Sequence, residues 1–194
     1  MPSLSSYAAS VAAVDVAVIG AGINGLAVAR ESARRGLSVA LIDQDDLGAR
    51  TSAISTRLIH GGLKYLERFE LNLVHESIRE RNILLKRAPH LVHHYPMLIP
   101  FSKAQSRPGW MLSCGLMLHD VLALGKPLPF NQIVFRGRLK RDWPSLAETG
   151  LKWAGLFHDA HVPLTERLNV ELAIDAHAHG ATVLTHTRVE ELSH

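Results

Sequence analysis

The chain has a single cysteine, Cys114, among its 194 residues. One cysteine cannot form an internal disulfide, and such sparing use is typical of proteins from a reducing compartment. The neighbours of Cys114 include Trp110, Leu112 and Met117. This apolar setting predicts a buried thiol and not a nucleophile.

Metal-site spacing is also lacking, although the chain has 12 histidines. His90, His93 and His94 share one short segment, but no further cysteine, histidine or aspartate completes a zinc-binding pattern. The sequence therefore predicts no metal site.

The chain has little excess of charge of either sign. It contains 21 Lys and Arg and 18 Asp and Glu, which gives a net charge of +3. No basic stripe is interleaved with aromatic residues, so we expect no nucleic acid partner. The basic clusters at 79–87 and 136–141 predict solvated helix faces, with a phosphate or anionic lipid as the alternative partner.

An uninterrupted hydrophobic run of membrane-spanning length is missing too. Residues 8–29 are apolar, but Asp15, Asn24 and glycines interrupt them, and no basic residue precedes Arg30. A spanning helix needs about 20 apolar residues, and a signal peptide begins with basic ones. The apolar segment 109–125 is shorter; it predicts a helix packed in the core, or alternatively a surface resting on a membrane or partner.

The remaining pattern is that of an α/β protein. Residues 16–20 predict a strand buried on both faces, 23–35 a helix ended by Gly36, and 38–43 a second buried strand. A strand, glycine turn, helix and strand within so few residues form a βαβ unit, which implies a parallel sheet. Further along, the sequence predicts helices at 70–86, 109–125 and 165–179, a strand at 181–185 that returns to the sheet, a loop at 96–109, and no clear period over 126–160.

The turn between the first strand and helix carries the spacing G-x-G-x-x-G in Gly20, Gly22 and Gly25, and Asp43 ends the second strand. Gly20 permits a tight turn, Gly22 lets the backbone approach a pyrophosphate, and Gly25 allows close packing. Free N–H groups at the helix start favour phosphates, and Asp43 suits a ribose diol. This context predicts a dinucleotide, either NAD or FAD; the acidic residue argues against NADP.

The stretch TSAISTRLIHGGLKYLE, residues 51–67, follows in the loop after the second strand. Ligands of such sheets bind at the carboxyl ends of the strands. Its short hydroxyl side chains suit a pyrophosphate and a ribityl chain, and Gly61 and Gly62 would let the chain pass a flat ring. Because a nicotinamide dinucleotide has no ribityl tail, this stretch favours FAD.

Three segments together resemble the FAD-dependent glycerol-3-phosphate dehydrogenases of the aerobic type. They are DVAVIGAGINGLAVARESARRGLSVALIDQDDLGARTSAISTRLIHGGLKYLE, FELNLVHESIRERNILLKRAPHL and HDAHVPLTERLNVELAIDAHAHGATVLTHTRV. The resemblance implies oxidation of sn-glycerol 3-phosphate at C2 to dihydroxyacetone phosphate, with hydride passing to flavin N5 and electrons to a quinone. Only the N-terminal part of such an enzyme is matched.

The resemblance also implies roles for individual residues. It assigns the adenosine diphosphate half of FAD to Gly20, Gly22, Asn24, Gly25 and Asp43. It assigns the flavin side to Thr51, Ser52, Ser55, Arg57, Leu58, Ile59 and His60. Lys64 and Tyr65 fall where the family has an arginine and a tyrosine near the substrate phosphate. For His60, the residues leave open a structural role, a flavin contact or a catalytic base; the resemblance puts the general base of the reaction beyond residue 194.

We therefore expect a Rossmann-type FAD-binding parallel sheet with the start of an inserted substrate or cap region. The expected boundaries are a leader at 1–13, the first part of the FAD-binding domain at 14–80, the cap region at 81–164, and the return to the FAD-binding domain at 165–194. The expected location is cytoplasmic, with peripheral contact at the inner face of the cell membrane.

Two other functions stay open. One is an FAD-dependent oxidoreductase of the amine or amino-acid oxidase type, and the other is a truncated, non-catalytic dinucleotide-binding fragment. We expect residues 1–194 alone to retain FAD weakly or not at all and to be inactive.

Overall fold

The computed structural model describes residues 13–50, 52–66, 68–101 and 109–192. The chain divides into two compact units: unit 1 contains residues 1–56 and 164–194, and unit 2 contains residues 57–163. The sequence analysis places the end of the first part of the FAD-binding domain at residue 80, whereas this division falls between residues 56 and 57. The functional names attached to those segments stay predictions.

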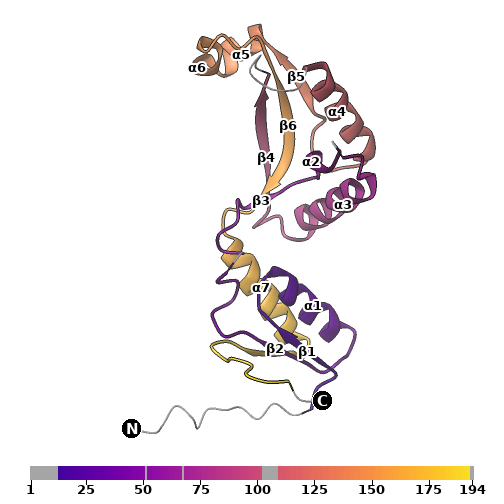
Figure 1. Cartoon of the computed structure of the whole chain (residues 1–194), viewed down its shortest axis with the longest axis vertical. Coiled ribbons are helices and arrows are strands. Elements are labelled where there is room, and N and C mark those ends of the chain that lie inside the picture. Colours follow the sequence, from indigo (N-terminus) through magenta and orange to yellow (C-terminus); the bar gives the residue numbers. More distant parts are fainter. Residues whose placement is uncertain (1–12, 51, 67, 102–108, 193–194) are drawn as a thin grey trace. The chain divides into compact units, whose positions relative to one another are not determined.

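Unit 1 is a three-stranded parallel sheet covered by two helices (Figure 1). Its elements are β1 (Val16–Ile19), α1 (Ile23–Arg34), β2 (Val39–Ile42), α7 (Thr165–Ala178) and β7 (Thr182–Leu184). Strand β2 lies in the centre, with Val16 beside Val39 and Leu184 beside Ile42. The βαβ unit and the return of the last strand to the same sheet are thus confirmed.

The core of unit 1 is built from small side chains. Ala29 and Ala33 of α1 and Ala173 and Ala176 of α7 are buried together with Leu41 of the sheet. Alanines at these positions let the two helix backbones approach closely, and burial of their methyl groups is favourable. An ion pair between Arg30 and Asp175 joins the same two helices.

Unit 2 is an antiparallel sheet with helices around it. Its elements are β3 (Leu58–Ile59), α2 (Leu63–Leu66), α3 (Leu71–Arg87), β4 (His93–Pro100), α4 (Gly109–Leu122), β5 (Gln132–Phe135), α5 (Arg136–Asp142), α6 (Pro144–Glu148) and β6 (Trp153–His161). The long strand β6 is central: β4 pairs along one edge, and β3 and β5 pair with its two ends along the other (Figure 1).

The two faces of β6 meet different partners. On one face, Phe157 lies edge-on to His119 of α4, and Gly155 lies close to Leu116. On the other face, Ala154 and Leu156 join a core with residues of β5, α5 and α6. Because both faces are covered, nearly the whole of β6 is buried.

Several sequence predictions are wrong in detail. Strand β1 is not buried on both faces, since Ala17 and Ile19 are exposed and Ile19 retains 56% of its surface. Residues 96–100, predicted as loop, continue β4, where Pro96 and Pro100 pair with β6. The prolines led to the prediction of a loop, but β4 is an edge strand of the sheet that the described residues form, where a missing N–H is tolerated.

Residues 126–160, which show no period, contain β5, α5, α6 and most of β6. The hydrophobic pattern of β6 is not evident from the sequence, because the strand buries two polar residues, His158 and Asp159, among apolar ones. Cys114, predicted to be buried, is exposed on α4. The predicted solvated face at 79–87 has one exception, Arg81, which is fully buried.

Candidate functional site

The glycine turn joins β1 to α1 in the compact form that the spacing predicts. Gly20 has a φ of 107°, and its N–H donates to the carbonyl oxygen of Ile42 at 2.8 Å. A Cβ added at Gly25 would lie 1.8 Å from the carbonyl oxygen of Gly20. Only glycine at position 25 therefore lets the helix begin so close to the turn.

The start of α1 is suited to an anion. Gly22 occupies the N-cap without any side-chain capping bond, and the first turn contains no acidic residue. The N–H of Ile23 donates to the hydroxyl oxygen of Ser52 at 3.2 Å, and Asn24 is exposed beside it. Because Gly22 has no side chain to cap the other N–H groups, the helix start with its partial positive charge fits a diphosphate.

Asp43 lies at the carboxyl end of β2 and faces the same turn. One oxygen of its carboxylate accepts the N–H of Ala21 at 2.6 Å, and the other accepts the N–H of Asp45 at 2.9 Å. A carboxylate offers about four acceptor positions, so each oxygen keeps one for a ribose diol. The two bonds fix the side chain next to the glycine turn.

The hydroxyl-rich segment folds back onto this turn. The N–H of Gly48 donates to the carbonyl oxygen of Ala21 at 2.9 Å, which brings the loop against the turn. The carbonyl oxygen of Ser52 accepts bonds from the hydroxyls of Ser55, at 3.2 Å, and Thr165, at 3.1 Å. Thr51, the remaining hydroxyl residue predicted to bind the cofactor in this segment, lies outside the described residues.

The other predicted site residues belong to unit 2. Arg57 has a φ of 60°, and its carbonyl oxygen accepts the N–H of Val162 at 2.8 Å. Its guanidinium donates to the carbonyl oxygen of Pro163. Leu58 and Ile59 form β3 and pair with β6, so the backbone leading to His60 is part of a sheet.

His60, Lys64 and Tyr65 lie close together in the sequence, at and just before the short helix α2. The rings of His60 and Tyr65 are tilted against each other with centroids 5.9 Å apart. Lys64 is exposed on the short helix α2, and Tyr65 next to it is half-buried. The arrangement presents a cation, a phenol and an imidazole from one short segment.

Sequence reasoning missed the residues beneath this segment. Arg81 of α3, His119 of α4 and Asp159 of β6 are all completely buried, and they surround Gly61. One signal for Arg81 was available: it follows Ile78 by three residues, and Ile78 follows Val74 by four. This helical spacing places all three on the buried stripe of α3.

Electrostatics at this cluster follow from burial. Burial lowers the pKa of His119 to about 4, so the ring is neutral at pH 7. Burial raises the pKa of Asp159, while the hydrogen bond and charge of Arg81 oppose that rise.

A pair of histidines links β4 to β6. His94 Nε2 and His158 Nδ1 are 2.7 Å apart, and the backbone N–H of His158 donates to the side-chain oxygen of Asn131. Burial lowers the pKa of both rings, and the charge of His94 lowers that of His158 further. Over the part of the chain that the structure describes, no group of three or more Cys, His, Asp or Glu could hold a metal ion.

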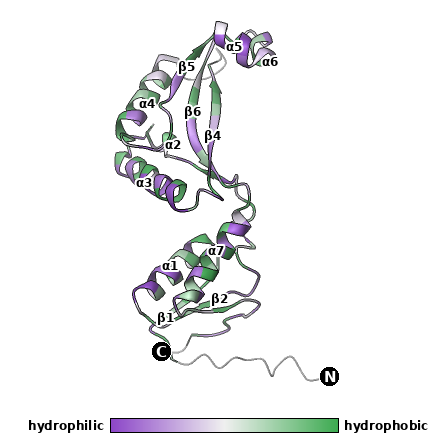
Figure 2. Cartoon of the chain, turned by 180° about the vertical axis from the view of Figure 1, so that it is seen from behind, coloured by the Kyte–Doolittle hydropathy of each residue, from purple (hydrophilic) through white to green (hydrophobic). Residues whose placement is uncertain are grey.

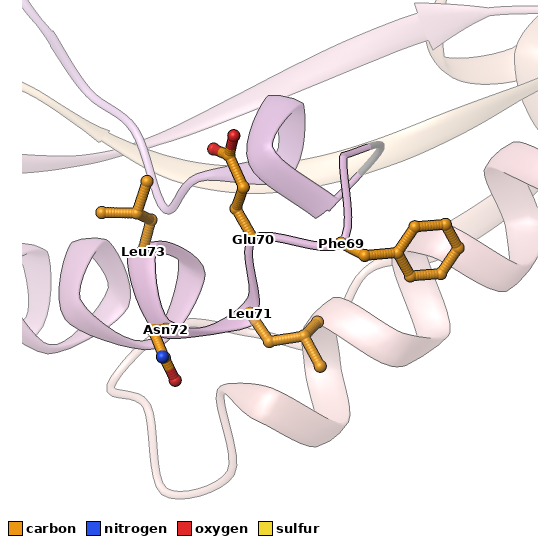
Figure 3. A pocket seen from close by; sticks show the side chains of 5 residues that line it. All are labelled: Phe69, Glu70, Leu71, Asn72 and Leu73. Atoms are coloured by element: carbon orange, nitrogen blue, oxygen red, sulfur yellow. The ribbon is translucent and has the colours of Figure 1, made fainter.

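A shallow pocket lies at the start of α3, in unit 2. Its lining is five consecutive residues, Phe69, Glu70, Leu71, Asn72 and Leu73 (Figure 3). Phe69 is 82% exposed and has a φ of 56°. The pocket adds an apolar rim to unit 2 but none of the predicted site residues.

Comparison with known proteins places these features in context. The chain is 43% identical over 180 residues to a glycerol-3-phosphate dehydrogenase of Synechocystis sp., a match covering 93% of this chain and 32% of that protein. It is 41% identical over 177 residues to D-erythritol 1-phosphate dehydrogenase of Brucella abortus, covering 90% of this chain and 34% of the other. The chain thus spans about a third of the length of these relatives.

The fold has solved counterparts as well. The glycerol-3-phosphate dehydrogenase of Bacillus halodurans, solved in complex with FAD, superposes with a TM-score of 0.66 at 24% identity, covering 93% of this chain and 28% of that one. The family model described as FAD dependent oxidoreductase matches residues 15–194. With its parallel sheet, glycine turn and acidic partner, this chain belongs to the FAD-dependent oxidoreductase family.

Proposed function

We propose that this chain is the N-terminal part of a dehydrogenase that oxidises sn-glycerol 3-phosphate to dihydroxyacetone phosphate. The observation that carries the proposal is the bond from Ile23 N–H to the Ser52 hydroxyl, because it brings the hydroxyl-rich segment to the glycine turn. The 43% identity to a named glycerol-3-phosphate dehydrogenase supports the choice of substrate. The chemistry that FAD supplies in such an enzyme is acceptance of a hydride at N5, here from C2 of the substrate.

In unit 1, the protein's own contribution is binding. The N-terminal turn of α1 and the backbone at Gly20 and Gly22 would hold the diphosphate, and Asp43 would accept bonds from the adenosine ribose. We propose Thr51, Ser52 and Ser55 for the continuation of the cofactor toward its flavin end.

In unit 2, Arg57, Leu58, Ile59 and His60 are proposed for the flavin side, and Lys64 and Tyr65 for the substrate phosphate. A lysine attracts a phosphate as a point charge, whereas an arginine offers two parallel hydrogen bonds. The Tyr65 hydroxyl is able to donate to a phosphate oxygen.

The substrate assignment is tested with a chimera in which residues 13–192 replace the matching third of the Synechocystis relative. We expect sn-glycerol 3-phosphate to bleach the flavin under anaerobic conditions, and amino acids to leave it oxidised. Bleaching by amino acids alone would instead support the amino-acid oxidase alternative. D-erythritol 1-phosphate is included as a third compound, because the 41% identity to the Brucella enzyme favours it as the second candidate substrate.

The role of Lys64 is tested in the same chimera. We expect Lys64→Gln to raise the KM for glycerol 3-phosphate at least tenfold, since one charge contact to phosphate contributes about 1.5–3 kcal/mol. Lys64→Arg should keep or lower the KM, because the fork is restored. Lys86→Gln, which removes an exposed lysine at the end of α3, is the matched control. An unchanged KM in Lys64→Gln would remove Lys64 from the site.

Electron transfer to a quinone at a membrane surface is proposed on the basis of α4. Trp110, Met117, Val121 and Leu124, in and just after this helix, are 60–72% exposed, and the helix is predominantly hydrophobic (Figure 2). No helix in the described part of the chain is long and apolar enough to cross a membrane. We therefore propose peripheral contact at the inner face of the cell membrane, through this apolar surface.

Membrane contact is tested by sedimentation of the chain with vesicles of neutral and anionic phospholipid. We expect Val121→Ser combined with Leu124→Ser to weaken binding at least tenfold, and Leu146→Ser on α6 to leave it unchanged. Equal binding by all three proteins would argue against α4 as the contact.

The chain by itself is proposed to retain FAD weakly and to be inactive. Calorimetric titration of residues 1–194 with FAD and with NAD tests this, and we expect a weak signal for FAD and none for NAD. Stoichiometric flavin in the purified chain would contradict weak retention. No heat with either nucleotide would argue against a dinucleotide-binding fragment.

A further inference from the structure

A buried polar cluster surrounds Gly61, in the segment between β3 and α2. Arg81, His119 and Asp159 come from α3, α4 and β6, and each has no exposed surface. Arg81 Nη1 donates to Asp159 Oδ1 at 2.9 Å. Burying a guanidinium and a carboxylate removes their hydration, so such a pair is retained at a cost in solvation.

Both backbone groups of Gly61 belong to this cluster. Its N–H donates to the two oxygens of Asp159 at 3.0 and 3.1 Å. Its carbonyl oxygen lies 3.0 Å from His119 Nε2. Because a carbonyl only accepts, Nε2 carries the proton, and Nδ1 is left to accept from the Asn131 amide at 3.4 Å. A neutral His119 satisfies both contacts, in agreement with its depressed pKa.

The backbone at Gly61 and Gly62 is closely packed against its neighbours. A Cβ at Gly61 would lie 2.4 Å from Arg81 Nη1 and 2.9 Å from His119 Nε2. Gly62 has a φ of 78°, and a Cβ there would lie 3.1 Å from the Cα of Val74. The close approach that these two glycines permit is therefore to helices α3 and α4. The segment is held by hydrogen bonds on one side and by a helix backbone on the other.

Stability alone does not explain the cluster. Replacing a buried ion pair by apolar residues of similar size is often neutral or stabilising, whereas a hydrogen-bonded polar network specifies one conformation of the chain that it contacts. Within the described residues Arg81 Nε has no hydrogen-bond partner, so the cluster holds Gly61 through Asp159 and His119, with Arg81 Nη1 bound to Asp159. The conformation specified here is that of the chain between His60 and the Lys64–Tyr65 pair. The contact between the His60 and Tyr65 rings spans that segment.

We propose that Arg81, Asp159 and His119 are positioning residues, which act through Gly61 to hold His60, Lys64 and Tyr65 in the arrangement that receives a substrate phosphate. The proposal rests on the proposed function for its phosphate ligand. It adds three residues, far from this segment in sequence, whose role is exerted on the backbone and not on the substrate.

The test compares five variants of the chain of residues 1–194 with the wild type by NMR. Arg81→Met and Asp159→Leu each leave a buried charge without its partner, so both lose stability for reasons unrelated to positioning. The double variant Arg81→Met/Asp159→Leu has no unpaired charge and is expected to recover most of that stability. Arg81→Lys keeps the charge and serves as the conservative rescue, while Asp142→Asn on α5 removes one partner of an exposed ion pair as control.

The decisive measurements are made on the double variant. We expect at least a tenfold loss of hydrogen-exchange protection at the Gly61 amide and loss of the nuclear Overhauser contact between the His60 and Tyr65 rings. Amides of α1 and β2 should be unchanged. Arg81→Lys should retain the ring contact, and Asp142→Asn should match the wild type. A folded double variant that keeps both the protection and the ring contact would overturn the proposal.

A titration with sn-glycerol 3-phosphate, and separately with inorganic phosphate, links positioning to binding. We expect shifts of the Lys64 and Tyr65 amides in the wild type and at least a tenfold higher Kd in the double variant. If the wild type gives no shift, the phosphate ligand is wrong, and the exchange and ring-contact results still decide whether the cluster fixes the segment. If the double variant binds as tightly as the wild type, the cluster does not serve binding.

Discussion

At the scale of single residues, a methyl group added to Gly25 would lie 1.8 Å from the Gly20 carbonyl oxygen, which is backbone and cannot rotate away. We predict that Gly25→Ala destabilises unit 1 by about 1–3 kcal/mol, the typical range for overpacking. Urea unfolding followed by circular dichroism measures the change. Gly137→Ala on α5, where a Cβ would meet nothing within 4 Å, is the control and should be neutral or slightly stabilising.

His119 gives a pH-dependent prediction. Its pKa falls from 6.5 to about 4 on folding, so between these values the unfolded chain binds a proton that the folded chain excludes. Stability is therefore lost as the pH falls from 6.5 to 4, by on the order of 3 kcal/mol from this group. Denaturant unfolding of the wild type and of His119→Gln at several pH values isolates the effect. Parallel pH profiles for the two proteins would contradict it.

At the scale of elements, α1 and α7 pack through alanines, and the volume between them is fixed. We predict that Ala29→Leu, at a fully buried position, lowers the free energy of unfolding by about 1–3 kcal/mol. Ala27→Leu is the matched control on the exposed side of the same helix and should change it by less than about 0.5 kcal/mol. Equal effects of the two changes would show that the packing is looser than described.

The elements differ in how far sequence could predict them. Helices α1 and α7 were placed to within a residue or two because their apolar period and terminal glycines are local signals. Strand β6 was missed because its polar residues find partners only in the folded chain. Asp159, for example, is stabilised by Arg81, 78 residues away in the sequence.

The candidate site divides in the same way. The glycine turn and Asp43 were predicted from spacing within one βαβ unit, and the structure brings Asp43 to the turn through the Ala21 N–H. The cluster around Gly61 joins three elements distant in sequence, and Arg81 reads as one more charged residue of a basic helix. Its burial depends on tertiary packing, which local pattern does not encode.

At the scale of the whole molecule, the two units have separate cores. All three tryptophans, Trp110, Trp143 and Trp153, lie in unit 2, so intrinsic fluorescence reports on that unit, whereas circular dichroism reports on both. We predict that Gly25→Ala lowers the denaturation midpoint seen by circular dichroism and leaves the fluorescence midpoint in place. Equal shifts of the two midpoints would mean that the chain unfolds as one cooperative block.

Unit 1 is assembled from two stretches of chain, with the whole of unit 2 between them. During synthesis, β1, α1 and β2 leave the ribosome first, but their third strand and second helix are made only after residue 163. The nascent βαβ unit must therefore wait with one edge of β2 unpaired and the alanine side of α1 uncovered, while all of unit 2 emerges. Slow translation between residues 57 and 163 would prolong that exposure, and chaperone capture should be strongest at this stage.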